Sequence, residues 1–275
     1  MATPPSKPRL AANLSMIFPE VEFLDRFAAA AAVGFRAIEY LFPYAFAKAE
    51  IRARLDSWGL EQVLFNAPPG DFENGERGIA GLPGRETEFR KSIELALDYA
   101  ATLRCPRIHV MAGLVPIAGD PRRHREVYVE NLSWAASQAR NGAIDLMIEP
   151  LNAKDFPGYL IGTPQAARSV IEEVGARNIR LQYDFYHAQM THGRLLDTFA
   201  AEQDLIGHVQ IAGVPGRNEP DDSQEINYRA VFAGLETMGY GGWIGCEYRP
   251  RGDTVAGLAW AAPYGIGPNH KKAGA

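Results

Sequence analysis

The sequence predicts an α/β protein built as a single (β/α)8 TIM barrel. The chain has 275 residues, a length that suits one barrel of this kind. Short apolar runs alternate with helix-length segments along the chain, as they do in successive βα units. Four of the later runs end at an oxygen-bearing side chain, which is typical of strands that deliver polar groups to the carboxyl-terminal rim of a barrel.

The expected strands are short, mostly apolar runs. In order, they span residues 9–18, 37–42, 61–66, 106–111, 144–149, 179–184, 205–210 and 243–247. The most informative run is 144–149, which ends at Glu149. Pro150 follows at once and has no N–H to donate, so the strand must stop there. Pro43 closes the second run in the same way.

The expected helices fill the gaps between these strands and carry apolar or alanine-rich faces at helical spacing. They span residues 21–33, 45–58, 85–103, 121–141, 164–174, 186–201 and 227–238. Gly34 and Gly59 are placed to end the first two helices as C-caps, and Thr163 is placed to begin the fifth as an N-cap. Gly193 interrupts the sixth.

A single domain is expected over residues 9–264. It lies between a flexible lead-in at residues 1–8 and a flexible tail at residues 265–275. Two Gly- and Pro-rich loops, 67–84 and 212–225, interrupt the alternation. Because long loops without secondary structure usually carry function in compact domains, we expect residues 67–84 to cover the rim.

Composition excludes several kinds of partner. The net charge is −5 and there is no basic stripe, so nucleic acid is not an expected ligand. No apolar run is long enough to cross a membrane, and the amino terminus does not resemble a secretory signal. The only cysteines, Cys105 and Cys246, give no disulfide framework, and we expect a cytoplasmic protein in which both are packed and inert. Barrels of this kind often form homo-oligomers, although no interface signal is visible.

Four side chains at the ends of strands form the candidate metal site: Glu149, Asp184, Gln210 and Glu247. If the strands close into a barrel, these side chains converge on one rim. Three converging carboxylates would repel one another strongly unless a cation compensates them. An all-oxygen ligand set favours one hard divalent cation, Mg²⁺ or Mn²⁺.

This ligand set also predicts a reaction. Four protein ligands leave two positions of an octahedron for the adjacent hydroxyl and carbonyl oxygens of a substrate. Binding of both oxygens to the metal would acidify the C–H between them. Glu149 and Glu247 come from strands well apart around the barrel and could act as catalytic base and acid on opposite sides. The expected outcome is an aldose–ketose type isomerisation through a cis-enediolate.

Other polar residues surround this predicted site. Strand alternation places Gln182 and His208 beneath the metal, where they would orient Asp184 and Gln210. Three residues are candidates for substrate binding: His187, His109 and Arg217. Arg217 lies on the loop after the seventh strand, where a guanidinium could hold a substrate carboxylate.

Several stretches of the sequence, some of which contain these candidate site residues, resemble those of a known protein family. Two of them are Ile148-Glu-Pro-Leu-Asn152 and Gln182-Tyr-Asp-Phe-Tyr-His187. The others lie at 11–16, 42–44, 83–86, 207–212, 225–228 and 242–248. From residue 9 to about residue 264, the chain resembles the hydroxypyruvate isomerase family of xylose isomerase-like TIM barrels. The resemblance implies a metal-dependent isomerase with catalytic glutamates at Glu149 and Glu247, and metal ligands at these two positions and at Asp184 and Gln210.

The resemblance leaves the substrate, a small hydroxy-oxo acid, open between two choices. Residues 148–152 look more like enzymes that convert hydroxypyruvate to tartronate semialdehyde, which is the leading expectation. Residues 109–113 and 210–213 look more like 2-oxo-tetronate isomerases. A ketose 3-epimerase is disfavoured, because the chain has Asp155 where those enzymes have a second Glu and Gln210 where they tend to have His.

Two other classes of function remain as alternatives. A metal-dependent phosphodiesterase or endonuclease on the same barrel would use more His ligands and a multinuclear centre. A non-enzymatic sugar-acid binding protein would not need two glutamates facing each other. Motifs of the type GxGxxG, GxxxxGK[ST], HExxH and GxSxG are absent from the sequence, so it offers no phosphate cradle, zinc-protease helix or hydrolase elbow.

Overall fold

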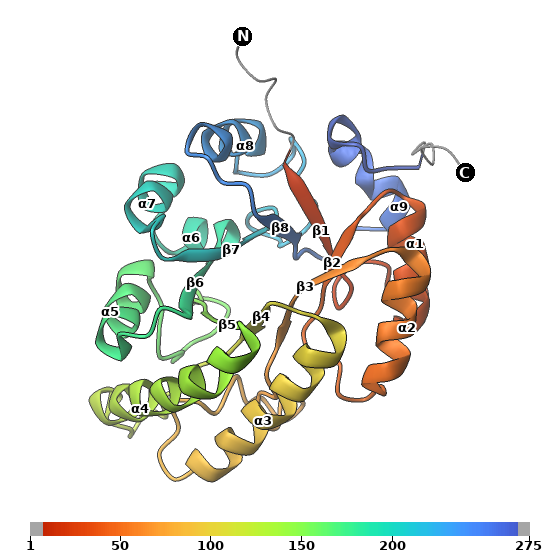
Figure 1. The fold of residues 1–275 in the computed structure, drawn as a ribbon. Helices are drawn as coiled ribbons and strands as arrows, with labels where there is room; N and C mark the ends of the chain where they lie inside the picture. The colour runs from red at the N-terminus through yellow and green to blue at the C-terminus, as the bar shows by residue number, and fades with distance from the viewer. Residues whose placement is uncertain (1–7, 269–275) are drawn as a thin grey trace.

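The computed structural model describes residues 8–268 and contains a closed barrel of eight parallel strands (Figure 1). Each strand pairs with the next in sequence, and β8 pairs with β1. The strands are β1 (Arg9–Asn13), β2 (Ala37–Glu39), β3 (Glu61–Asn66), β4 (Arg107–His109), β5 (Asp145–Ile148), β6 (Ile179–Asp184), β7 (Ile206–Ile211) and β8 (Trp243–Cys246). The predicted fold class, a single (β/α)8 barrel, is confirmed.

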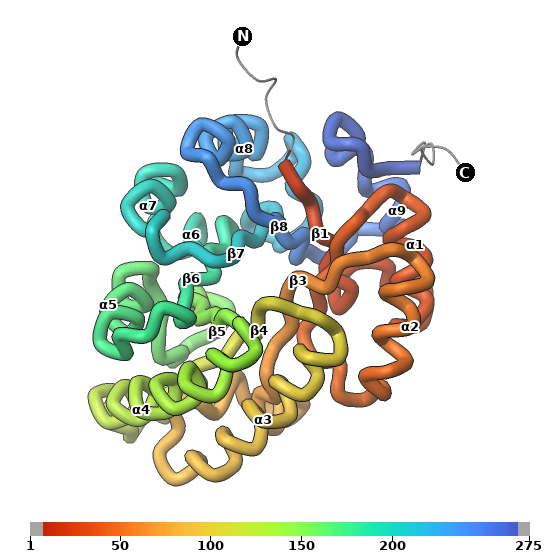
Figure 2. Tube along the Cα trace, viewed as in Figure 1, coloured from red at the N-terminus to blue at the C-terminus, as the bar shows by residue number. Residues whose placement is uncertain are grey.

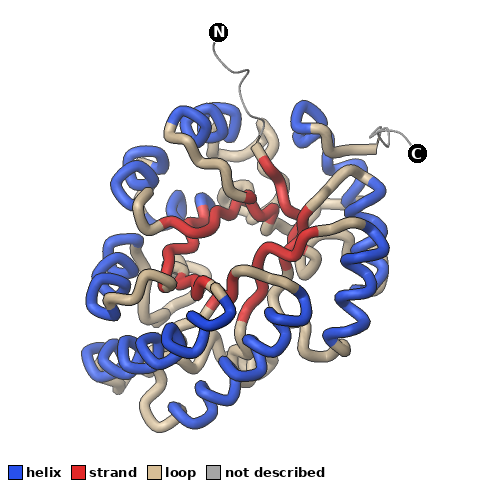
Figure 3. The backbone as a smooth tube through the Cα atoms, viewed as in Figure 1, coloured by secondary structure: helices blue, strands red, loops and turns tan. Residues whose placement is uncertain are grey.

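Helices surround the strands on the outside of the barrel, as the blue and red segments of Figure 3 show. The α-helices are α1 (Arg26–Ala32), α2 (Lys48–Trp58), α3 (Glu86–Leu103), α4 (Pro121–Ala139), α5 (Pro164–Val174), α6 (Phe185–Thr191), α7 (Leu195–Glu202), α8 (Tyr228–Thr237) and α9 (Thr254–Gly257). Three 3₁₀ helices, η1 (Phe23–Asp25), η2 (Arg140–Gly142) and η3 (Leu258–Tyr264), complete the described elements. The Cα trace in Figure 2 follows this alternation around the ring.

Helix ends follow local chemistry that the sequence displays. The hydroxyl of Thr163 accepts a hydrogen bond from the backbone N–H of Ala166 and caps α5, as predicted. Gly59 ends α2 in a left-handed conformation, also as predicted. Around Gly193 the predicted helix 186–201 divides into α6 and α7.

Three strands end at least two residues before the runs that predicted them. β1 ends at Asn13 rather than at residue 18, β2 ends at Glu39 rather than at residue 42, and β4 ends at His109 rather than at residue 111. Tyr40 and Val110 are nevertheless buried. An apolar run therefore indicates which residues are buried and not which residues form strand hydrogen bonds. The chain remains buried where it turns over the rim, beyond the last strand hydrogen bond.

Inside the barrel, the two ends differ in polarity. Ala11, Ala37 and Val63 form a small apolar cluster, against which Trp243 packs. Beyond this cluster, toward the carboxyl ends of the strands, the buried interior becomes polar and includes Glu39. The chemistry of the molecule is consequently concentrated at one end of the barrel, as in other barrels of this type.

The expected lead-in and tail lie largely outside the described residues, because 1–7 and 269–275 are not described. Within the part of the chain that is described, none of the helices has the length and apolar character needed to cross a membrane.

Candidate active site

The four predicted metal ligands all lie at the carboxyl ends of strands and are buried. Asp184 is the last residue of β6 and pairs in register with Gln210 of β7. Glu149 follows the end of β5, and Glu247 follows the end of β8. The strand endings that the sequence displayed therefore deliver these side chains to one rim.

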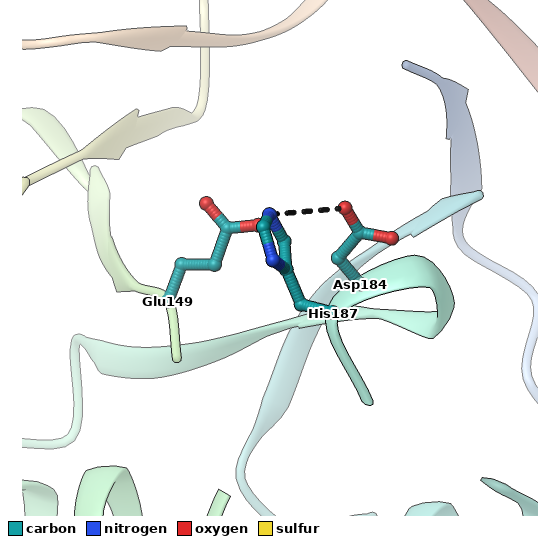
Figure 4. A group of neighbouring side chains, drawn as sticks. All are labelled: Glu149, Asp184 and His187. Carbon is teal, nitrogen blue, oxygen red and sulfur yellow. Dashed lines mark ion pairs between the residues drawn. The ribbon is translucent and has the colours of Figure 1, made fainter. Parts of the chain in front are cut away.

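One group of potential metal ligands stands out within residues 8–268. Single ligand atoms of Glu149, Asp184 and His187 all lie within 4.8 Å of one another (Figure 4). Glu149 Oε1, Asp184 Oδ2 and His187 Nε2 are buried and have no hydrogen-bond partner among the described residues. Because unpartnered buried polar atoms are costly, this donor set fits a bound cation.

His187 has a place in this group that the sequence did not predict, since it was expected to contact substrate. Its Nδ1 accepts a hydrogen bond from the backbone N–H of Asn152, at 3.1 Å. That bond leaves Nε2 facing Asp184 Oδ2 at 3.8 Å. His187 lies in the first turn of α6, whose N-cap is Asp184, so the two side chains share a rim because they share a helix start.

Gln210 and Glu247 are not part of this close group. The Gln210 Oε1 atom accepts a hydrogen bond from Gln182 Nε2 at 2.6 Å. Glu247 Oε2 lies 2.8 Å from Arg217 Nη2. Their roles as metal ligands remain predictions.

Arg217 reaches into the acidic rim from the loop after β7. Besides its bond to Glu247, its Nη2 lies 3.6 Å from Asp184 Oδ2. The guanidinium also lies over the ring of Tyr186, 5.0 Å from the centroid. In this structure the arginine that was predicted to hold a substrate carboxylate pairs with two carboxylates of the protein itself.

Burial shifts the pKa values of the rim residues in opposite directions. Burial, together with the charges of Glu247 and Asp184, raises the pKa of Glu149 well above its ordinary value. Burial raises the pKa of Asp184 to about 6 and that of Glu247 to about 7, although Arg217 opposes both shifts. Burial also lowers the pKa of His187 well below its ordinary value, so this imidazole is neutral and available as a ligand.

His109, the third predicted substrate contact, is buried at the end of β4. Its Nδ1 lies 3.7 Å from Glu149 Oε2. Burial, followed by the nearby His208, lowers its pKa to about 3, so the ring is neutral at pH 7. It can therefore contact Glu149 or a substrate oxygen as a neutral hydrogen-bonding group.

Glu39 is a central residue of the site that sequence reasoning missed. Its side chain is 0% exposed and accepts hydrogen bonds from Asn13 Nδ2 (3.0 Å) and Gln210 Nε2 (2.8 Å). Its other oxygen lies 2.6 Å from His208 Nε2. The sequence does contain a signal for this residue, because Glu39 is the single charged residue inside the apolar run 37–42.

The residues expected beneath the metal are therefore connected through Glu39. Gln182 contacts Gln210 directly, whereas His208 contacts Glu39, which in turn holds Gln210. Gly245 completes this layer, because a Cβ at that position would overlap both carboxylate oxygens of Glu39. The glycine on β8 makes room for the acid on β2.

A cavity of about 260 Å³ opens above the acidic rim. Its lining includes Glu149, Glu247 and Arg217, and also Phe72 and Arg77 from the loop 67–84. The loop therefore contributes to the wall of the site, in agreement with its predicted position over the rim. Both cysteines lie elsewhere, buried and free; burial raises the pKa of the Cys105 thiol to about 12 and also raises that of Cys246.

Comparison with known proteins identifies relatives that cover almost the whole chain. The family model described as xylose isomerase-like TIM barrel matches residues 27–264. The 2-oxo-tetronate isomerase of Cupriavidus necator is 54% identical over 94% of this chain and 98% of its own length. The hydroxypyruvate isomerase of Escherichia coli K12 is 45% identical over 93% of this chain and 99% of its own length.

Among solved structures, AP endonuclease, family 2 from Brucella melitensis superposes with a TM-score of 0.91 at 46% identity. The match covers 94% of this chain and 99% of that one.

The fold and the site together define a barrel enzyme with a buried acidic rim that can hold a metal ion. The family model and the relatives show more: the chain belongs to the xylose isomerase-like TIM barrel family. Like its curated relatives, it is an isomerase of the intramolecular oxidoreductase type.

Proposed function

We propose that this protein is a metal-dependent isomerase of small hydroxy-oxo acids that interconverts a 2-oxo-3-hydroxy acid and its 3-oxo-2-hydroxy isomer. The observation that carries this proposal is the group of buried, unpartnered ligand atoms on Glu149, Asp184 and His187, with Glu247 in the lining of the adjoining cavity. We place 2-oxo-tetronate first among the substrates, because identity to its isomerase (54%) exceeds identity to the hydroxypyruvate isomerase (45%). Hydroxypyruvate, which has the same reacting carbons, comes second.

One divalent cation, Mg²⁺ or Mn²⁺, would be held by Glu149, Asp184 and His187, with Gln210 and Glu247 as further predicted ligands. When bound, such an ion polarises the substrate carbonyl and acidifies the neighbouring C–H. The protein residues supply the proton transfers. One glutamate removes the proton from the hydroxyl-bearing C3, the second delivers a proton to C2, and the hydroxyl proton moves to the former carbonyl oxygen.

Glu149 and Glu247 suit these two transfers because of their positions and their pKa values. They follow β5 and β8, which β6 and β7 separate in the barrel, and both line the cavity. The pKa of Glu247 is raised to about 7, mainly by burial, so this carboxyl group can accept or donate a proton at neutral pH. Arg217 fixes the orientation of Glu247 through the 2.8 Å contact.

Asp155 supports an isomerase rather than a 3-epimerase. It accepts hydrogen bonds from Asn152 Nδ2 (3.0 Å) and from the hydroxyl of Tyr186 (2.7 Å). The carboxylate of Asp155 thus holds Asn152 and Tyr186, the neighbours of His187, in position. In the resembling 3-epimerases this position is a Glu, whose side chain is one methylene longer than that of Asp155.

Reaction of both acids in D₂O with Mg²⁺-loaded and with Mn²⁺-loaded enzyme, followed by proton NMR after removal of the metal, tests the proposal. We expect conversion and deuterium incorporation with the wild type, and a loss of at least about 100-fold in Glu149→Gln and Glu247→Gln, because each removes a proton carrier. Glu94→Gln on the exposed face of α3 is the matched control and should keep full activity. Absence of turnover of both acids by metal-loaded wild type would refute the proposal.

The name of the Brucella structure makes nuclease activity a useful second assay. In the described part of the chain, clustered His, Cys, Asp and Glu ligands form one three-residue group, whereas a nuclease of this fold is expected to use a multinuclear centre. We therefore expect no cleavage of duplex DNA that contains an abasic site. Cleavage that Glu149→Gln abolishes would favour the nuclease instead.

A further inference from the structure

The guanidinium group of Arg77 forms part of the cavity wall and has no assigned role. Its Nη1 donates hydrogen bonds to the backbone oxygens of Phe72 (3.0 Å) and Glu76 (2.7 Å). Its Cζ atom lies over the ring of Phe72, 4.1 Å from the centroid. These contacts hold the guanidinium in one orientation before any ligand binds, which reduces the entropy lost on binding.

The loop that carries Arg77 is itself firmly anchored. Glu76 accepts hydrogen bonds from the backbone N–H of Asp71 (2.5 Å) and from Arg85 Nη1 (2.7 Å). Gly78 has a φ of 106°, and a Cβ there would overlap the backbone oxygen of Met111. The loop therefore lies directly against the chain that leaves β4, and only glycine permits this approach.

Further along the same loop, Asn131 and His124 of α4 contact backbone oxygens. The Asn131 Nδ2 atom donates to Ala80 O at 2.7 Å, and His124 Nδ1 lies 2.8 Å from Gly81 O. Both side chains are buried. The segment is thus a fixed wall of the site, and it can hold a guanidinium at a constant position.

One edge of this guanidinium is available to a ligand. No carboxylate of the described residues lies within ion-pair distance of Arg77, and its Nε and Nη2 make no hydrogen bond to them. This pair of N–H groups matches the two oxygens of a carboxylate. Arg217 differs, because its Nη2 is paired with Glu247 and Asp184, while its buried Nε has no partner among the described residues.

We propose that Arg77 binds the substrate carboxylate through this free edge and selects acids over neutral sugars of the same length. This inference rests on the proposed function, since it assigns the recognition element for that substrate class. An anionic substrate entering a cavity that holds Glu149 and Glu247 meets like charge. A fixed cation on the loop wall attracts the C1 carboxylate away from these acids and leaves C2 and C3 to face them.

Steady-state kinetics of Arg77 variants test the proposal. For Arg77→Met we expect the KM for 2-oxo-tetronate and hydroxypyruvate to rise about 10- to 100-fold, as for the loss of a charged hydrogen-bond pair, with kcat changed only a few-fold. Arg77→Lys should recover part of the loss, because it restores the charge without the fork. The preference for hydroxypyruvate over dihydroxyacetone, its analogue without a carboxylate, should fall by the same factor in Arg77→Met.

The matched control is Arg90→Met, which removes another arginine stacked on an aromatic ring, 5.2 Å over Trp134 and away from the cavity. It should leave KM unchanged. Calorimetric Mn²⁺ titration should give wild-type affinity for Arg77→Met, which shows that the rim is intact.

A KM within twofold of wild type in Arg77→Met would overturn the inference, and a large rise in KM in Arg217→Met instead would place the carboxylate at Arg217. Inactive wild-type enzyme would show that the proposed function, rather than this residue assignment, has failed.

Discussion

Replacing Glu39 with Gln tests whether the buried layer beneath the rim positions Gln210. The substitution keeps the shape of the side chain but removes its charge. Glu39 accepts hydrogen bonds from three groups, on Asn13, Gln210 and His208. A glutamine amide presents one oxygen and one NH₂ group. The oxygen can keep the bonds from Asn13 and Gln210, but the NH₂ group then faces His208 Nε2. His208 must shift to its other tautomer, which places a proton on Nδ1, a buried atom without a partner among the described residues.

The expected cost follows from these contacts. The change removes a charge-assisted hydrogen bond, at about 1.5–3 kcal/mol, and leaves a fully buried donor unsatisfied, at about 1–3 kcal/mol. We therefore expect Glu39→Gln to lower the free energy of unfolding by about 3–5 kcal/mol, in line with breaking a buried charged pair. Urea unfolding of the metal-free protein, followed by circular dichroism, measures this difference.

Metal affinity provides the second measurement. Glu39 holds the Nε2 end of Gln210, which leaves Oε1 on the side of Gln182. Without this constraint the amide can rotate, and we expect Mn²⁺ affinity to fall about 10- to 100-fold, as when other groups that orient ligands are lost. In a Gln210→Ala background the same substitution should have no further effect on Mn²⁺ affinity.

A loss of less than about 1 kcal/mol in unfolding free energy, with unchanged Mn²⁺ affinity, would refute this reasoning, because such a result lies below the cost of one buried unsatisfied donor. Glu94→Gln, on the exposed surface of α3, controls for the loss of one charge.

Three further predictions follow from the same geometry. Gly245→Ala should destabilise the protein by about 1–3 kcal/mol in urea unfolding, because the new Cβ overlaps the carboxylate of Glu39; stability equal to wild type would mean that this layer is loosely packed. Mn²⁺ affinity should rise from about pH 6 to about pH 8, since bound ligands must be deprotonated and burial raises the pKa of Asp184 to about 6 and of Glu247 to about 7; a calorimetric titration without proton release at pH 7 would contradict this. Gly78→Ala should raise the KM for the oxo acid at least several-fold, because the loop must leave its position against β4, and an unchanged KM would show that the loop tolerates the displacement.

The barrel could be predicted because the apolar composition of each strand shows that the strand is buried. A parallel strand enclosed by helices is apolar on both faces, so its position is visible in the sequence without knowledge of its neighbours. The extent of hydrogen bonding is not visible in this way. Residues such as Leu14, Tyr40 and Val110 remain buried after their strands have ended, which is why the strands predicted for β1, β2 and β4 are too long.

The site was predictable to the extent that strands deliver it. Asp184, Gln210 and the glutamates after β5 and β8 could be read as polar ends of apolar runs. Glu39 ends a strand in the same way, but the apolar residues that follow it conceal the ending. The alternation of side chains along its strand was enough to identify His208 as an inward-facing residue. Its 2.6 Å contact with Glu39 joins β7 to β2 across the interior of the closed barrel, and no local sequence pattern encodes such a contact.

For residues that reach the site from loops, such as Arg217, the backbone conformation decides where the side chain points. Its backbone is in the left-handed region, with φ of 54°, a conformation that costs a non-glycine residue on the order of 1 kcal/mol. The cost is offset where the guanidinium meets Glu247 and Asp184. A sequence reveals the arginine and the Gly- and Pro-rich composition around it, but not the backbone angle that directs the side chain toward these two carboxylates. The same reasoning separates Arg217 from Arg77, since both are arginines on long loops over one rim. Only the three-dimensional structure shows that Arg217 is paired with protein carboxylates, whereas Arg77 contacts backbone oxygens and the ring of Phe72.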